Sequence, residues 1–131
     1  MCRDPNDPYA RYEPLTEQQI LEINLHAAEE KGDYPRLTEE SGKFGVPQEI
    51  VGDKSKVVGR RVREMIVYMN SIIIDSQLED PEYADQILSD CRNEEDLCCF
   101  WAVEGECEAN EGYMTQSCGP CCKTCDLYDE P

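Results

Sequence analysis

The chain contains little of what most enzymes use for chemistry. It has a single histidine, His26, among 131 residues. A non-haem iron site needs two histidines and a carboxylate, so the sequence excludes that kind of site. The sequence also has no glycine-rich phosphate loop and no nucleophile elbow, and its many carboxylates show no pattern that marks a catalytic pair. We therefore expect a protein that is not an enzyme and that has no cofactor and no metal site.

Basic residues are scarce as well. Twelve lysines and arginines stand against 29 acidic residues, which gives a net charge of −17 and an isoelectric point near 4.2. Such a surface repels phosphate backbones and anionic lipid headgroups, so nucleic-acid binding is disfavoured. No apolar run approaches the roughly 18 to 20 residues that span a bilayer, so no membrane insertion is expected. Basic proteins or metal cations remain as partners, and we expect a protein.

Cysteine, in contrast, is abundant. Eight of the nine cysteines lie between Cys91 and Cys125. Half-cystines at this density in a small domain favour disulfides formed in an oxidising compartment. We expect a secreted protein or one of the endoplasmic reticulum lumen, and the thylakoid lumen is also compatible. The first residues contain no apolar region typical of a signal peptide, so we expect that a targeting segment has been removed or that the chain is an excised or mature form.

Six of these cysteines form a pattern with the residues around them. The spacing is Cys91-x6-Cys98-x8-Cys107-x10-Cys118-x3-Cys122-x2-Cys125, with Phe100-Trp101-Ala102 after the second cysteine and Gly105-Glu106 before the third. This pattern resembles the ShK-type domain of sea-anemone potassium-channel toxins, which recurs as an accessory module in secreted enzymes. The resemblance implies the pairs Cys91–Cys125, Cys98–Cys118 and Cys107–Cys122. Spacing alone leaves 15 connectivities open for six cysteines.

Two further cysteines, Cys99 and Cys121, stand beside the second and fifth positions of the pattern. Their neighbours would belong to different bridges of one compact knot, so we expect a fourth bridge between them. Two free, buried thiols are one alternative. A zinc site is another, because Cys118-x2-Cys121 and Cys122-x2-Cys125 have ligand-like spacing. Cys2 is then the odd cysteine, and we expect it to be free or to form an intermolecular disulfide.

Channel block is not expected from this chain. The resembled toxins use a Lys-Tyr pair between their third and fourth half-cystines, and Gly112-Tyr113 occupies the matching positions here. The lysine is missing, and a net charge of −17 disfavours attraction to the mouth of a cation-selective pore.

The chain before the cysteines has a helical pattern. Thr16 and Gln19 form a capping box that opens a predicted helix from Thr16 to Lys31. A longer predicted helix runs from Asp53 to about Gln77, and Asp80-Pro81 opens a short one to Leu88. The stretch 33–52 is interrupted by prolines and glycines and predicts an extended connector. The long helix carries an apolar stripe of Val58, Val62, Met65, Met69 and Ile72, widened by Val57, Ile66 and Ile73, and the connector is expected to be held by Phe44, Val46 and Ile50.

The expected fold is therefore mainly α, with a helical region and a small disulfide-rich, ShK-like knot at the C-terminus. The expected organisation is an irregular acidic arm (1–15), a helical region (16–90), the knot (91–125) and an acidic tail (126–131).

The first half of the long predicted helix carries the only concentration of basic residues in the chain. Arg60, Arg61 and Arg63 lie close together there. The simpler interpretation is that they pair with acidic residues of the same chain. The alternative is that they form a docking surface for an acidic partner.

A looser resemblance covers the chain from Gly45 to its end. The stretch Gly45-Val-Pro-Gln48, a long helix with Met65 and Tyr68-Met69, and then the knot are similar to the region before the catalytic domain in prolyl 4-hydroxylase-like oxygenases of algae, diatoms in particular. That resemblance implies a substrate-positioning module of a 2-oxoglutarate oxygenase whose catalytic domain is absent from this chain. We expect first a non-catalytic structural or interaction subunit of a larger assembly, with the oxygenase module as the alternative.

Overall fold

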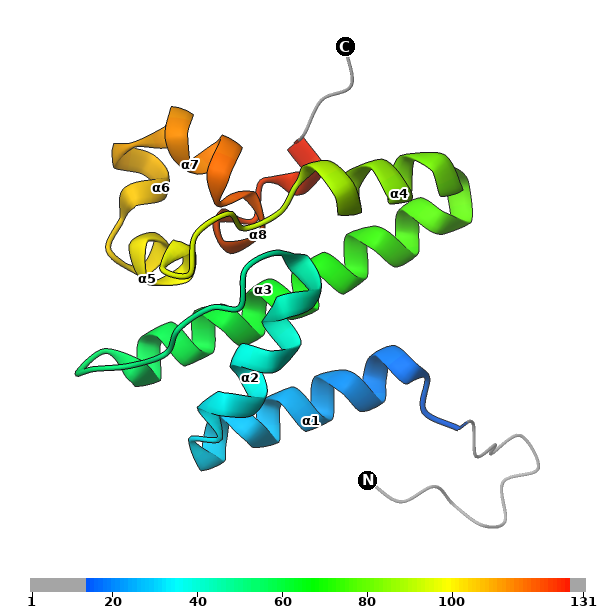
Figure 1. Cartoon of the computed structure of the whole chain (residues 1–131). Helices are drawn as coiled ribbons and strands as arrows, with labels where there is room; N and C mark the ends of the chain where they lie inside the picture. Colours follow the sequence, from blue (N-terminus) through cyan, green and yellow to red (C-terminus); the bar gives the residue numbers. More distant parts are fainter. Residues whose placement is uncertain (1–13, 128–131) are drawn as a thin grey trace, which may run out of the picture.

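A 25-residue helix, α3 (Ser55–Glu79), lies at the centre of the computed structural model, which describes residues 14–127 (Figure 1). Its bounds lie two residues from those predicted. Apolar side chains recur along it in steps of four and three, so they share one face and can be buried together. The members of the predicted stripe that are almost fully buried, at 0 to 1% exposure, are Val58, Val62, Met65, Ile66 and Met69.

The first helix, α1 (Glu17–Lys31), begins one residue after the predicted start, with Thr16 as its N-cap, and ends at Lys31 as predicted. The Thr16 hydroxyl accepts the Gln19 N–H at 3.1 Å, and the Gln19 side-chain oxygen accepts the Thr16 N–H at 2.9 Å. This reciprocal pair satisfies two of the N–H groups that a helix start leaves unpaired. Gly32 closes the helix with φ of 72°, in the left-handed region that glycine adopts without strain.

The predicted extended connector is wrong over its first half. Tyr34–Ser41 form a second helix, α2, and a 3-10 turn, η1 (Gly42–Phe44), follows it. Pro35 lies in the first turn of α2, where its missing N–H would have had no helical partner. The proline therefore helps to start a helix rather than interrupting the chain.

The remaining helices are shorter. Asp80 caps α4 (Pro81–Asp90), since its carboxylate accepts the Glu82 and Tyr83 N–H groups, as the sequence predicts. Residues 91–125, the cystine segment, then fold into α5 (Cys98–Val103), α6 (Glu106–Ala109), α7 (Glu111–Ser117) and α8 (Gly119–Cys122), with a final 3-10 turn, η2 (Cys125–Leu127). The described residues contain isolated bridges but no strand, so the mainly α fold is confirmed.

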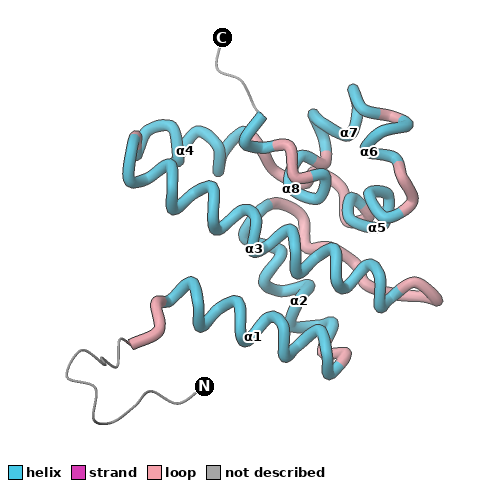
Figure 2. The backbone as a smooth tube through the Cα atoms, turned by 180° about the vertical axis from the view of Figure 1, so that it is seen from behind, coloured by secondary structure: helices cyan, strands magenta, loops and turns pink. Residues whose placement is uncertain are grey.

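The elements form layers around α3. Figures 1 and 2 show α1 and α2 on one side of α3, with α4 and the cystine segment on the other. One hydrophobic core includes side chains of α1, α2, α3 and α4 together with the cystines. No helix within residues 14–127 combines the length and the apolar composition that crossing a bilayer requires.

The prediction that Val57 and Val46 belong to the core is wrong. Val57 is 53% exposed and Val46 is 39% exposed. Val57 lies one position before the buried Val58, which turns it away from the stripe by about 100°. Phe44 and Ile50 are buried, as predicted.

The chain between α2 and α3 crosses the cystine segment at close range. Gly45 pairs with Asn93 in a parallel bridge, and the Val46 N–H donates to the Asn93 carbonyl at 2.8 Å. The backbone of Gly45 has φ of 131°, and a Cβ there would lie 2.3 Å from the Asn93 carbonyl oxygen. Only glycine allows this approach without displacing the neighbouring backbone. We call the contact of residues 44–50 with the cystine segment the junction.

Candidate protein-interaction site

Four disulfides lie within the cystine segment. They are Cys91–Cys125, Cys98–Cys118, Cys99–Cys121 and Cys107–Cys122. Three are the pairs that the ShK-type resemblance implies, and the other is the expected fourth bridge. All eight cysteines are consumed, so none of them is a free thiol or a thiolate available to zinc. Four disulfides in so short a stretch indicate an oxidising, extracellular or lumenal environment. Cys2 lies outside the described residues.

The disulfides position helices that are too short to be stable alone. The helices α5 to α8 are four to seven residues long, whereas isolated helices below about 12 to 15 residues are marginal in water. Cys98 ties α5 to the end of α7, and Cys107 ties α6 to α8. The side chains on these helices therefore have fixed relative positions only while the crosslinks are intact.

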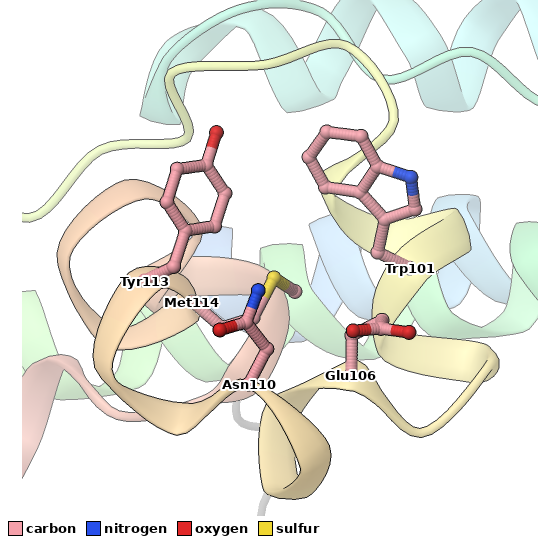
Figure 3. Close-up of a pocket in the computed structure, with 5 residues that line it drawn as sticks. All are labelled: Trp101, Glu106, Asn110, Tyr113 and Met114. Atoms are coloured by element: carbon pink, nitrogen blue, oxygen red, sulfur yellow. The ribbon is translucent and has the colours of Figure 1, made fainter.

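Three of these helices, α5, α6 and α7, line a small pocket, which Figure 3 shows with its lining side chains. Its volume is about 180 Å³. The ring centroids of Trp101 and Tyr113 are 6.3 Å apart, and the two ring planes are tilted by 58°. Met114 is 1% exposed, whereas Tyr113 is 44% exposed. The lining residues are Trp101 from α5, Glu106 from α6, Asn110, and Tyr113 and Met114 from α7.

The surroundings of this pocket are negatively charged. From Phe100 to Ser117 the sequence carries four glutamates and no lysine, arginine or histidine. Glu104 forms an ion pair with Lys54 of the loop before α3. Within residues 14–127, no basic side chain forms an ion pair with Glu106. The pocket therefore combines two aromatic rings with a carboxylate that no described residue neutralises.

The three arginines singled out in the sequence are engaged within the chain. Arg60 and Arg63 both donate to the Glu29 carboxylate of α1, Arg60 at 3.3 Å. Arg61 instead donates to the Cys121 carbonyl at 2.7 Å. The arginines thus diverge around α3 and join it to two different neighbours. These contacts follow the simpler interpretation, pairing within the chain.

The Glu29 carboxyl group is perturbed by this arrangement. Burial alone would raise its pKa, but the hydrogen bonds from Arg63 and Arg60 and their positive charges hold the pKa below its usual value. Glu29 is therefore charged in the folded protein over the whole neutral range. Its role is to connect α1 to α3.

His26 lies on the exposed surface of α1. Its Nδ1 is 3.2 Å from a carboxylate oxygen of Glu30, one helical turn away, and its side chain is 59% exposed. The part of the chain that the structure describes contains no cluster of three or more histidine, cysteine or acidic side chains placed to hold a metal ion. His26 thus has the surroundings of a solvated surface residue.

The sequence analysis named three of the five pocket residues without predicting a pocket. Trp101 entered as a position of the ShK-type pattern, and Tyr113 as the site of a missing toxin dyad. Twelve residues separate them, and nothing in that spacing brings their rings together. The Cys98–Cys118 bond connects the helices that carry them. The only sequence signal was a pair of aromatic residues among four glutamates within a crosslinked stretch.

Comparison with known proteins gives partial matches only. No protein-family model matches the chain, and no solved structure matches it. The chain is 36% identical over 70 residues to the peroxidase mlt-7 of Caenorhabditis elegans. This alignment covers 51% of the present chain and 10% of the peroxidase. It is 46% identical over 35 residues to the putative tyrosinase-like protein tyr-3 and 42% identical over 38 residues to the peroxidase skpo-1, both of the same nematode. These alignments cover 5% and 6% of those two proteins. The chain thus spans about a tenth or less of the length of these relatives.

Proposed function

We propose that this chain is a non-catalytic interaction module that binds a protein partner in an oxidising compartment, through the surface of its cystine segment. The observation that carries this proposal is the crosslinked set of short helices around the pocket of Trp101 and Tyr113. A surface held rigid by covalent bonds loses little conformational entropy on binding. The compartment is extracellular or the lumen of the endoplasmic reticulum, with the thylakoid lumen as a further candidate.

The partial matches support an accessory role. Two of them are 35 and 38 residues long, and the cystine segment, residues 91–125, has the same length as the shorter one. Matches this short, to a peroxidase and to a tyrosinase-like protein, do not account for the two different activities after which those proteins are named. Its recurrence fits a module that is attached to other functions.

The oxygenase alternative rests on the resemblance of Gly45-Val-Pro-Gln48 and the long helix to algal prolyl 4-hydroxylase-like proteins. Within the chain, Gly45 and Gln48 already have a structural role, because both pack at the junction. Sequencing the transcript beyond Pro131 distinguishes the two functions. A histidine-containing oxygenase domain in the same reading frame would favour a substrate-positioning module.

The proposal is tested by co-purification from the native source with the disulfide-intact chain as bait. We expect a partner at fixed stoichiometry. The control is the same chain after full reduction and alkylation, which removes the crosslinked surface. Recovery of the same partner with both baits, or of no partner with the intact one, would contradict a role for the cystine segment in binding.

A further inference from the structure

The pocket of Trp101 and Tyr113 has the size of a single side chain. Its volume is about 180 Å³, whereas sites for cofactors and drug-sized molecules range from about 300 to 1,000 Å³. The two rings and the buried Met114 give it apolar walls, and Glu106 and Asn110 give it polar ones (Figure 3). An occupant that matches these walls has an apolar stem and a polar end.

The aromatic pair favours a positive charge on that polar end. A cation is attracted to an aromatic ring when it lies over the ring face and within about 6 Å of the ring centroid. The centroids of Trp101 and Tyr113 are 6.3 Å apart, so one cation at the mouth of the pocket can lie within that range of both rings. An alkyl stem can meanwhile pack on the rings and on the Met114 thioether.

The charge around the pocket favours the same occupant. Glu106 lines the pocket and has no ion-pair partner within residues 14–127, in contrast to Glu104, which Lys54 neutralises. The stretch from Phe100 to Ser117 is purely acidic in its charges, and the whole chain carries −17. A field of this sign attracts basic proteins and accelerates their association.

We propose that this pocket binds the cationic side chain of a lysine or arginine presented by a basic protein partner. Glu106 is the counter-ion, Trp101 and Tyr113 are the aromatic walls, and Met114 is the base of the pocket. This inference rests on the proposed function, and it specifies the site and the chemistry of the partner.

The chain provides its own probe for a direct test. Trp101 is its only tryptophan among seven tyrosines, so fluorescence excited selectively at the indole reports on the pocket. The titrants are short blocked peptides that contain a central lysine or arginine, with a norleucine peptide as the control that keeps the stem and lacks the charge. With the disulfide-intact full chain at low salt, we expect saturable fluorescence changes with both cationic peptides and none with norleucine. Added salt should weaken the binding.

Matched variants locate the binding. We expect Glu106→Gln to weaken binding by roughly 2- to 5-fold, the effect of one exposed charge or cation–π contact. Glu108→Gln removes the same charge from the same helix at a residue outside the pocket and should leave the affinity unchanged. Tyr113→Leu removes one ring and should weaken binding similarly, whereas Tyr113→Phe keeps the ring and should not. Since Tyr113 is 44% exposed, these changes spare the core.

The outcomes are separable. No fluorescence response to either cationic peptide would overturn the inference, and so would equal losses in Glu106→Gln and Glu108→Gln, since binding would then follow the general charge. Tetramethylammonium that binds as tightly as the peptides would point to a small cation and overturn the assignment of a side chain. A partner captured equally well by the wild-type chain and by Tyr113→Leu would leave the proposed function standing and remove this pocket from it. Peptide binding with no captured partner would support the pocket and count against the proposed function.

Discussion

Substitutions of Gln48 test how the helical region and the cystine segment, the two halves of this molecule, are joined. Gln48 is fully buried at the junction. Its Nε2 donates to the carbonyls of Val46 and Glu95, each at 2.9 Å, and its Oε1 accepts the Cys99 N–H at 2.8 Å. Two of these three partners belong to the cystine segment. One buried amide thus satisfies backbone groups of both halves.

Replacing Gln48 with methionine should be strongly destabilising. Methionine has a similar length but makes none of the three hydrogen bonds, and it leaves the Cys99 N–H buried without a partner. Each lost bond contributes about 1 kcal/mol net, and an orphaned buried donor costs about 1 to 3 kcal/mol more. We therefore expect the free energy of unfolding to fall by about 4 to 6 kcal/mol, a large share of the roughly 5 to 15 kcal/mol typical of a domain.

Replacing Gln48 with glutamate gives the more specific signature. The new carboxyl group keeps an acceptor for the Cys99 N–H, but in its charged form it places an oxygen against the carbonyls of Val46 and Glu95. Burial and these carbonyl dipoles should raise its pKa in the folded state. A raised pKa contributes stability that is present at low pH and is lost as the pH rises through the folded value. Gln48→Glu should therefore be closer to wild type at about pH 4 than at about pH 7.

The measurement is equilibrium unfolding in denaturant with the disulfides intact, at both pH values. Gln86→Glu is the control, because Gln86 is exposed on α4 and acquires the same charge. The free energy of unfolding should depend more strongly on pH in Gln48→Glu than in Gln86→Glu. In Gln48→Met its pH dependence should equal that of the wild type. A loss below about 0.5 kcal/mol in Gln48→Met, the range of ordinary surface changes, would refute the hydrogen-bonding argument. Equal pH dependence of the two glutamate variants would refute it as well.

Three further changes test the packing around α3. Met65→Asp buries an unpaired carboxylate at a fully buried position; it should cost several kcal/mol and abolish the cooperative transition seen by circular dichroism, and a normal transition would show that the stripe is not core. Gly45→Ala places a Cβ 2.3 Å from the Asn93 carbonyl at φ of 131° and should lower the melting temperature by several degrees or more, whereas Gly112→Ala, which meets no atom, should not. Glu29→Gln should cost about 1 to 2 kcal/mol at neutral pH. Because the folded pKa of Glu29 is lowered, the difference from wild type should shrink as the pH falls through that value, and a constant difference would contradict the ion-pair role.

The local signals in the sequence were sufficient for α1, α3 and α4. Capping side chains mark the starts of α1 and α4, and a long apolar repeat marks α3, which has no side-chain cap. These signals depend only on residues within the helix or next to it. Helix α2 was missed because Pro35, Gly32 and Gly42 were interpreted as interruptions. Its stability comes from packing, since Leu37 is fully buried and the Tyr34 ring lies so close to Gly59 that a Cβ there would be 2.8 Å from it. Such a contact between positions 25 residues apart leaves no local pattern.

The buried polar residues could not be predicted from the sequence either. Gln48 and Asn93 are both nearly fully buried, yet polar residues at isolated positions are ordinarily predicted to face solvent. Their side-chain oxygens accept the Cys99 and Cys121 N–H groups, which lie in the first turns of α5 and α8 and have no partner within those helices. The disulfide pattern was predictable because its spacing resembles a known domain. The polar contacts that fit the segment to the helices depend on the three-dimensional arrangement.

The fourth disulfide, Cys99–Cys121, lies where the cystine segment contacts the helical region. Cys99 and Cys121 are fully buried, and their backbone groups make two of the contacts between the cystine segment and the rest of the molecule. The Cys99 N–H donates to Gln48, and the Cys121 carbonyl accepts from Arg61 of α3. Trp101 follows Cys99 by two positions on α5, which places it on a different side of a helix with 3.6 residues per turn. The cysteines added to the six-cysteine pattern therefore fix the face that contacts the helices, and the opposite side of α5 is left to line the pocket.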